Sequence, residues 1–173
     1  GMHGVFKDMN DAINASIEAQ KKVCTMTLDQ REQIISLIRK KTHENAEILA
    51  NMGVNETGMG NVGDKILKHH LTADKVPGTE DISTIAWSGD RGLTLVEMGP
   101  FGVIGAITPA TNPSETVICN CIGMLAGGNT VVFNPHPAAV KTSLYAVNLV
   151  NEASLEQGGP DNIAVSVENP TLD

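Results

Sequence analysis

The stretch Phe101–Pro113, FGVIGAITPATNP, decides the fold class of this chain. Its first eight residues form an apolar run, which is typical of a strand buried on both faces of a parallel sheet. The run ends at a polar loop with prolines at positions 109 and 113, and a helical pattern follows as far as Ala126. A strand that leads directly into a helix predicts an α/β protein.

The alternation of strands and helices continues toward the C-terminus. A second buried strand is predicted over NTVVFN (129–134), and a long helix begins at Pro137 and stops at Gly158-Gly159. NIAVSV (162–167) is a third strand. The order β-α-β-α-β predicts half of a doubly wound, Rossmann-like parallel sheet with right-handed crossovers. Three strands with an unpaired last strand do not complete a domain, so we expect a truncated protein.

The first 75 residues or so have helical patterns. One helix is predicted from about Asp8, a second from Thr27, which forms a capping-box pattern with Gln30, and a third over 64–73. The expected buried stripe of the first helix is Ile13, Ile17, Gln20 and Cys24. That of the second, which should continue to about Gly53, is Ile35, Ile38, Thr42, Ala46 and Leu49.

A β-hairpin is predicted between the helices and the sheet. β-Branched segments flank the turn sequence Gly89-Asp90-Arg91-Gly92. The chain therefore divides into an N-terminal helical segment (2–76), a hairpin (82–99) and the first part of a nucleotide-binding domain (100–173). An incomplete sheet exposes apolar surface and an edge, so we also expect self-association.

The composition excludes several partners. The net charge of −8 makes binding to nucleic acid or to an anionic membrane unfavourable. Apolar residues make up 41% of the chain and charged residues 18%, as in an ordinary globular protein. Three cysteines without framework spacing fit a reducing cytoplasm.

The cysteines and histidines do not form a recognisable metal or nucleophile motif. Cys119 and Cys121 lie two apart on a helix and cannot chelate one metal, so packing is the favoured interpretation for both, as it is for Cys24. His69 and His70 are expected to be exposed. His136, between two prolines at the end of a strand, is the histidine best placed to contact a ligand. We predict no metal site.

Two loops occupy the position where parallel sheets bind ligands, beyond the carboxyl ends of the strands: TPATNP (108–113) and NPHPAA (134–139). In the first, Asn112 has the position of an N-cap, Pro113 that of the first helical residue and Glu115 that of the capping partner. The free N–H groups of such a helix can hold an anion or a developing oxyanion. The alternative is that these residues only cap the helix. The fingerprint G-x-G-x-x-G is absent after the first strand.

Three motifs together resemble one enzyme family. EMGPFGVIGAITPATNPSETV (97–117), GGNTVVFNPHPAAVKTS (127–143) and ETGMG (56–60) followed by DK (64–65) are similar to the N-terminal part of an aldehyde dehydrogenase. The resemblance is strongest to the CoA-acylating propionaldehyde and acetaldehyde dehydrogenases of propanediol and ethanolamine utilisation. It implies a reaction of a small aldehyde, CoA and NAD that gives acyl-CoA and NADH. It also implies a homo-oligomer, to which the hairpin contributes, in the cytoplasm or inside a bacterial microcompartment.

The resemblance assigns residues by position. The oxyanion-hole candidates are Thr111 and Asn112. The cofactor-binding candidates are Ile107, Thr108, Pro109, Ala110, Asn134, His136 and Pro137. Asn134 stands where many relatives have a lysine that bonds the adenosine ribose. The missing cation argues for NAD rather than NADP.

The family's catalytic cysteine and general-base glutamate would lie beyond Asp173, so the 173-residue chain alone is expected to be inactive. Two alternatives remain at this stage. The chain could be a stand-alone nucleotide-binding module, or a structural protein that associates with a full-length partner. The reading frame beyond Asp173 distinguishes them from an enzyme fragment.

Overall fold

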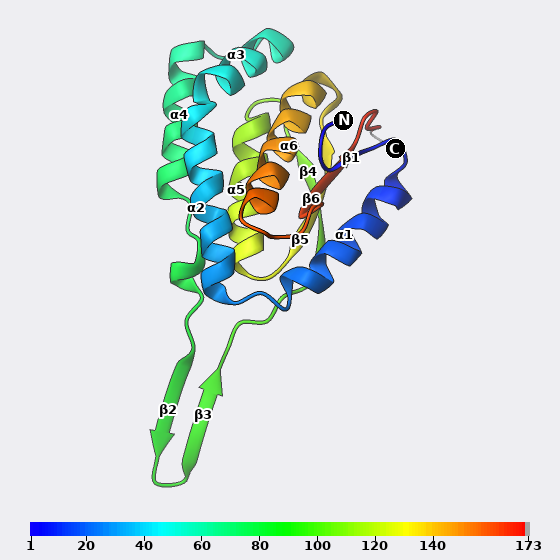
Figure 1. Cartoon of the computed structure of the whole chain (residues 1–173). Coiled ribbons are helices and arrows are strands. Elements are labelled where there is room, and N and C mark those ends of the chain that lie inside the picture. Colours follow the sequence, from blue (N-terminus) through cyan, green and yellow to red (C-terminus); the bar gives the residue numbers. More distant parts are fainter. Residues whose placement is uncertain (172–173) are drawn as a thin grey trace.

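The computed structural model describes residues 1–171, which form four layers with a projecting hairpin (Figure 1). Helix α1 covers one face of a parallel sheet, α5 and α6 cover the other, and α2, α3 and α4 pack outside α5 and α6. The elements in chain order are β1 (Val5–Phe6), α1 (Met9–Val23), α2 (Leu28–Glu44), α3 (Ala46–Thr57), α4 (Val62–Lys75), η1 (Thr79–Asp81), β2 (Ile85–Gly89), β3 (Gly92–Val96), β4 (Val103–Thr108), α5 (Pro113–Ala126), β5 (Thr130–Pro135), η2 (Pro137–Ala139), α6 (Val140–Glu156) and β6 (Ala164–Val167).

The predicted β-α-β-α-β unit is confirmed as β4-α5-β5-α6-β6. The sheet has the order β1-β6-β5-β4, and each neighbouring pair is parallel. Val103 lies opposite Thr130, and Val131 lies opposite Ala164. Because side chains alternate between faces, Val131 and Phe133 pack in the main core with α5 and α6, whereas Val132 and Val165 pack against α1.

The expectation of an unpaired last strand was wrong. The N-terminal strand β1 pairs with the outer edge of β6, with Val5 opposite Ser166 and Phe6 opposite Val167. The preceding Gly4 has φ +76°, and a Cβ there would lie 2.3 Å from the carbonyl oxygen of Ala164. A two-residue strand has no hydrophobic period of its own, so the sequence pattern could not reveal it.

The expectation that β4 is buried on both faces was also wrong. In the described sheet β4 is an edge strand, and α1 lies mainly over β5 and β6. Gly105 is exposed, and the side chain of Ile107 is 86% exposed. The burial predicted for β5 is confirmed, and the last strand, β6, is also buried.

Helix α1 buries a different stripe from the predicted one. Its N-cap is Asp8, as expected, but its buried residues are Ala12, Ser16, Ala19 and Val23. Small side chains form this stripe because the helix lies close to the sheet, where the Ser16 hydroxyl donates to Thr130 Oγ1 at 2.9 Å. Cys24 is exposed, so the prediction that it packs in the core was wrong.

The second predicted helix is divided into two, so the N-terminal region has four helices rather than three. Thr27 and Gln30 form the predicted capping box at the start of α2. The chain turns at Asn45, whose Oδ1 accepts a hydrogen bond from the Tyr145 hydroxyl at 2.9 Å, and α3 continues from Ala46. The predicted buried stripe nevertheless continues across the turn.

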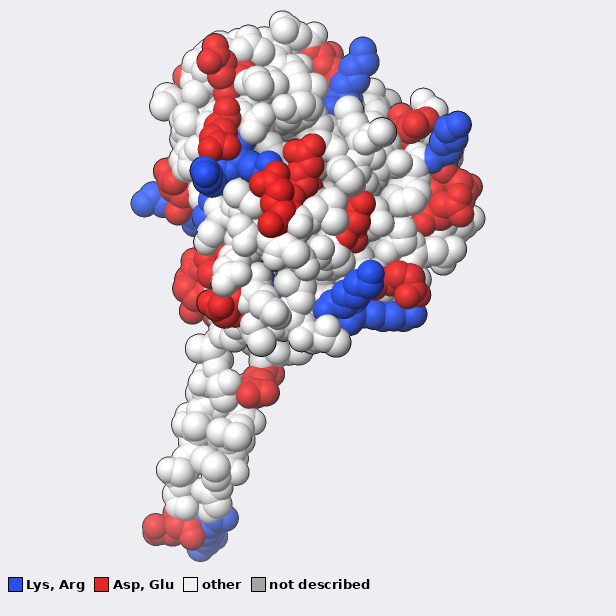
Figure 2. Space-filling model, viewed as in Figure 1, with Lys and Arg blue, Asp and Glu red and all other residues white. Residues whose placement is uncertain are grey.

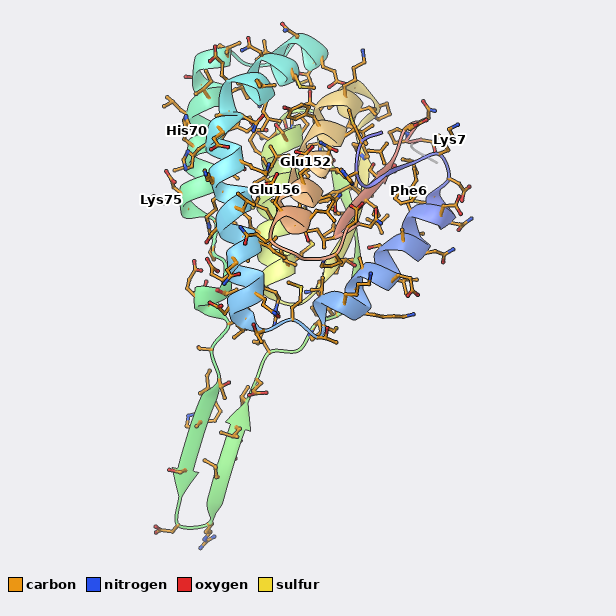
Figure 3. The ribbon with its side chains drawn as sticks, in the orientation of Figure 1. Phe6, Lys7, His70, Lys75, Glu152 and Glu156 are labelled. Carbon is orange, nitrogen blue, oxygen red and sulfur yellow. The ribbon has the colours of Figure 1, made fainter. Side chains whose placement is uncertain are left out.

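The helical layers are linked by polar as well as apolar contacts. Lys41 on α2 forms ion pairs with Glu156 at 2.7 Å and Glu152 at 3.9 Å, and both glutamates lie on α6 (Figure 3). The main core lies between these layers and the sheet, and its largest fully buried side chains include Phe133, Ile34 and Ile118. Within residues 1–171, no helix has both the length and the hydrophobicity needed to cross a bilayer.

The predicted hairpin is confirmed as β2 and β3, which pair antiparallel around Asp90-Arg91. It projects away from the body, and every residue from 83 to 101 is exposed. Figure 2 shows charged side chains at its tip and near the body, with uncharged surface between them. Its exposed apolar side chains are Ile85, Trp87, Leu93, Leu95 and Val96. An isolated two-stranded hairpin with such a surface is marginally stable in water, so it needs a partner surface.

We therefore predict that the chain self-associates through the hairpin. Replacing Leu93 and Leu95 by serine should shift the protein toward monomers, because it removes exposed apolar area that association would bury. Light scattering over a range of concentrations measures the change. The matched control replaces Leu67 and Leu71 by serine, because these two leucines on α4 are about as exposed as Leu93 and Leu95. A parent protein that is monomeric at every concentration would contradict the prediction.

Candidate functional site

The two predicted loops lie side by side at one edge of the sheet. Thr108, the last residue of β4, is opposite Pro135, the last residue of β5. The backbone N–H of His136 donates to the carbonyl oxygen of Thr108 at 3.0 Å. The segments TPATNP and NPHPAA therefore share the carboxyl edge of the parallel sheet, where ligands bind in this class of fold.

Two cofactor-binding candidates form an exposed surface on this edge. Ile107 and Asn134 are register partners, so their side chains project from the same face as Val103 and Val132, the face on which α1 lies. Gly105 precedes Ile107 on this face, and a Cβ there would contact nothing within 4 Å. Asn134 donates from Nδ2 to the carbonyl oxygen of Thr171 at 3.0 Å. The result is an apolar surface with an amide at its side.

The remaining cofactor-binding candidates are divided between exposed and buried positions. Pro109, His136 and Pro137 are exposed, whereas Thr108 and Ala110 are buried. The Thr108 hydroxyl has no hydrogen-bond partner among the described residues. His136 uses Nδ1 to accept the backbone N–H of Ala138 at 3.0 Å, so this nitrogen already has a structural role.

The oxyanion candidates lie on the side of the loop that faces α4. Helix α5 begins at Pro113, as predicted, but the side chain of Asn112 does not cap it. Asn112 Oδ1 instead accepts from Lys65 Nζ at 3.3 Å and from Lys68 Nζ at 3.4 Å. Glu115 does not act as the capping partner either, because its carboxylate pairs with Lys65 at 3.3 Å. Thr111 is exposed.

Helix α4 contributes a buried polar cluster that the sequence did not reveal. Lys65 is only 5% exposed, and its ammonium group also donates to the carbonyl oxygen of Thr111. His69, one turn later, is buried, so the expectation that it is exposed was wrong. Its Nδ1 lies 2.6 Å from the Lys65 carbonyl oxygen and its Nε2 lies 2.7 Å from Ser114 Oγ. The i, i+4 spacing of Lys65 and His69, which places them on one face of a helix, was the sequence signal that could have revealed this cluster.

The tautomer of His69 follows from these partners. A carbonyl oxygen can only accept, so Nδ1 carries the proton and Nε2 accepts from the Ser114 hydroxyl. Burial lowers the pKa of His69, and the nearby Glu115 carboxylate opposes this effect only in part. The imidazole is therefore a neutral link between α4 and α5.

Glu56 is a second residue whose role the sequence did not reveal. Its carboxylate accepts the backbone N–H groups of Lys141 at 2.7 Å and Thr142 at 2.8 Å, and the Thr142 hydroxyl at 2.6 Å. A carboxylate is favourable at this place, because the first N–H groups of a helix have no intrahelical acceptor. Glu56 thus fixes the start of α6, directly after the second loop. The sequence signal that pointed to a role for Glu56 was its position in the motif ETGMG.

Two of the three cysteines, Cys119 and Cys121, are not activated as nucleophiles. Cys121 is buried, as predicted, and burial raises the pKa of its thiol. Cys119 is exposed, so the packing interpretation was wrong for this residue, yet partial burial still raises the pKa of its thiol. A nucleophilic cysteine needs a cation or a helix N-terminus that lowers the pKa.

A groove of about 300 Å³ lies between α4 and α5, beside the first loop. Asn112 borders it at the loop, Leu71 on α4 and Cys119 on α5. A small molecule in this groove would contact Asn112 from the side of α4.

A further histidine pair lies away from the loops. His70 on α4 and His43 on α2 face each other with their Nδ1 atoms 2.5 Å apart, and His43 Nε2 lies 2.7 Å from Asp74 (Figure 3 labels His70). In the described part of the chain, no three His, Cys, Asp or Glu side chains are grouped so that they could hold a metal ion.

Comparison with known proteins shows the family. The model of the aldehyde dehydrogenase family matches residues 3–167, so the chain belongs to this family. A propionaldehyde dehydrogenase from the fucose utilisation microcompartment of Clostridium phytofermentans is 76% identical, with a TM-score of 0.97 over 99% of this chain and 39% of that one. The propionaldehyde dehydrogenase of Rhodopseudomonas palustris, solved with propionyl-CoA bound, is 48% identical, with a TM-score of 0.95 over 98% of this chain and 38% of that one.

A curated relative agrees with these structures. The acetylating acetaldehyde dehydrogenase of Bilophila wadsworthia is 48% identical over all of this chain, which corresponds to 35% of its own length. The chain thus spans little more than a third of the relatives that it matches. The predicted resemblance to the CoA-acylating branch is confirmed.

The buried His69 predicts a specific pH dependence of stability. Its pKa is lower in the folded protein than in the unfolded chain, where it is about 6.5. Below that pH the unfolded chain binds the additional proton, so the free energy of unfolding decreases as the pH falls. His69→Gln should reduce this slope by up to about 1.4 kcal/mol per pH unit. The slope is measured as the free energy of unfolding in urea at several pH values on both sides of about pH 6.5.

The control for this prediction is Leu67→Gln on the exposed face of the same helix, because it removes no titratable group. It should leave the slope unchanged. Equal slopes for the parent and His69→Gln would contradict the proposed neutral link.

Proposed function

We propose that this chain is the first part of the cofactor-binding domain of a CoA-acylating aldehyde dehydrogenase, which converts a small aldehyde, CoA and NAD to acyl-CoA and NADH. The observation that carries the proposal is the shared carboxyl edge of β4 and β5. On this edge the side chains of Ile107 on β4 and Asn134 on β5 form one surface. Asn112, whose amide can stabilise an oxyanion, lies in the loop that follows β4. The CoA and the aldehyde of the relatives support the choice of substrates.

The residues at the sheet edge fit a dinucleotide. Ile107 offers an exposed apolar surface for a planar ring, and Gly105 leaves the neighbouring backbone open. Asn134 can bond a ribose hydroxyl through its amide. Thr108, Pro109 and Ala110 continue the strand into the loop, and His136 and Pro137 flank the second loop. When bound, NAD supplies the hydride acceptor of the reaction.

Asn112 is the oxyanion donor that we favour over Thr111. Its Oδ1 faces two lysines, which can only donate, so its Nδ2 group is turned away from them. Nδ2 makes no hydrogen bond within residues 1–171 and can donate to the aldehyde oxygen as negative charge develops there.

The remaining groups of the reaction come, in this proposal, from outside this chain. Burial disfavours the thiolates of Cys119 and Cys121, and none of the three cysteines matches the nucleophile position of the family, so we assign the nucleophile to another segment and expect the 173-residue chain alone to be inactive. The hairpin belongs to a homo-oligomer interface. Enclosure in a bacterial microcompartment is also part of the proposal, because a relative with 76% identity comes from one.

The test uses the full-length protein encoded by the reading frame that contains this chain. We expect CoA-dependent formation of NADH from propionaldehyde by that protein and none by the 173-residue chain. Asn112→Ala should lower kcat by about 10²- to 10³-fold, as loss of an oxyanion donor does elsewhere. Thr111→Ala, the matched control, should have a smaller effect. Formation of NADH by the short chain, or a reaction that does not need CoA, would contradict the proposal.

A second prediction concerns the choice between NAD and NADP. Asn134 has no charge to pair with a 2′-phosphate, so the full-length protein should have the higher kcat/KM with NAD. Asn134→Lys should shift this ratio toward NADP by up to about fivefold, because an exposed ion pair contributes up to about 1 kcal/mol. Asn134→Gln, which stays neutral, is the control. A parent enzyme that prefers NADP would refute this assignment.

A further inference from the structure

Lys65 lies beneath the first loop, and the motif around it explains how a lysine fits there. Helix α4 begins at Val62 with Asn61 as its cap, and Lys65 in its first turn contacts the start of α5. Gly60 has φ +76°, and a Cβ at this position would lie 3.3 Å from Cε of Lys65. A glycine therefore gives the turn its left-handed conformation and leaves room for the lysine stem.

The buried ammonium group has three acceptors, all in the segment that begins α5. They are the carbonyl oxygen of Thr111, Oδ1 of Asn112 and the carboxylate of Glu115. A buried cation is unfavourable unless its donors are satisfied. Rotation of the loop would remove acceptors from this cation, so the loop conformation and the lysine stabilise each other.

These contacts determine where the donors of Asn112 point. The described residues contain no cis peptide bonds, so the N–H of Asn112 points opposite to the carbonyl of Thr111, which faces Lys65. The side-chain oxygen of Asn112 also faces the lysine, so its Nδ2 group points away. Both donor groups of Asn112 are thus turned away from α4 by contacts to one cation.

We propose that Lys65 is the positioning residue of the oxyanion hole. It touches neither substrate nor cofactor, and it acts by holding the backbone and the amide of Asn112 in the orientation that donates to the aldehyde oxygen. This inference rests on the proposed function of Asn112. Lys68 assists from the exposed side at 3.4 Å, and the contact between His69 and Ser114 holds α4 against α5.

The test compares a full-length variant that lacks the whole buried lysine–glutamate pair with one in which only the carboxylate is neutralised. Lys65→Met combined with Glu115→Gln removes both members of the buried pair, and Glu115→Gln alone is its reference. We expect the double variant to have a kcat about 10²-fold below that reference, because small displacements of catalytic groups have effects of this size. The KM values for NAD and CoA should not change.

The matched control removes a lysine–glutamate pair elsewhere in the chain. Lys41→Met with Glu156→Gln deletes the pair between α2 and α6, whose Nζ–Oε1 distance is 2.7 Å. It should lower the thermal unfolding temperature but not kcat. If the Lys65→Met, Glu115→Gln variant and the Lys41→Met, Glu156→Gln variant lost kcat equally, Lys65 would act only through stability, and the inference would be overturned.

A double-mutant cycle with Asn112→Ala distinguishes positioning from other effects. If Lys65 acts through Asn112, its removal should cause a smaller loss of kcat in an enzyme that already lacks this amide, because only the backbone N–H of residue 112 is then left to be positioned. Losses that multiply would overturn the inference. A crystal structure of the Lys65→Met, Glu115→Gln variant gives a readout independent of activity, since the amide of Asn112 should be rotated. An unchanged amide would also overturn it.

The proposed function and this inference fail in different ways. If Asn112→Ala leaves kcat unchanged, the oxyanion role of Asn112 is wrong. If Asn112→Ala lowers kcat while the Lys65 variant matches its Glu115→Gln reference, only the positioning role is wrong.

Discussion

A parallel sheet must be covered on both faces, and this requirement organises the whole chain. Strands β5 and β6 are buried except at Asn134, with α5 and α6 on one face and α1 on the other. The N-terminal segment therefore supplies one helical layer and the strand β1, and the C-terminal half supplies the rest. Where this cover is missing, at β4, the strand stays half exposed. That exposed part, at Gly105 and Ile107, is where we place the cofactor.

Two charged side chains connect the helices α3 and α4 to the two loops of the site. Glu56, at the end of α3, accepts the N–H groups that begin α6, and Lys65 on α4 holds the loop that precedes α5. Both contacts join groups more than forty residues apart in the chain. The motif ETGMG and the following DK thus have a physical role. They place an anion at the start of α6 and a cation beneath the loop before α5, so that the helices α3 and α4 together hold both loops.

The exposed apolar surfaces are consistent with a part of a larger assembly. The hairpin and the edge strand β4 expose large hydrophobic side chains, including Trp87, Leu93 and Ile107. The relatives continue well beyond the matched region, which is 35% of one and 39% of another. In them, further chain or a second copy can cover such surfaces, and the hydrophobic effect favours this cover.

The sequence by itself determined the α/β class, the hairpin, the helix starts at Thr27 and Pro113, and the two loops that follow β4 and β5, because strand periodicity and proline positions are local signals. It could not determine which face of α1 is buried, because small residues form the contact, nor the pairing of β1, which is too short to have a pattern. Only the tertiary structure decided that Lys65, His69 and Glu56 serve the loops. Their partners are far away in the sequence, and a buried charge is stable only where the fold brings its acceptors together.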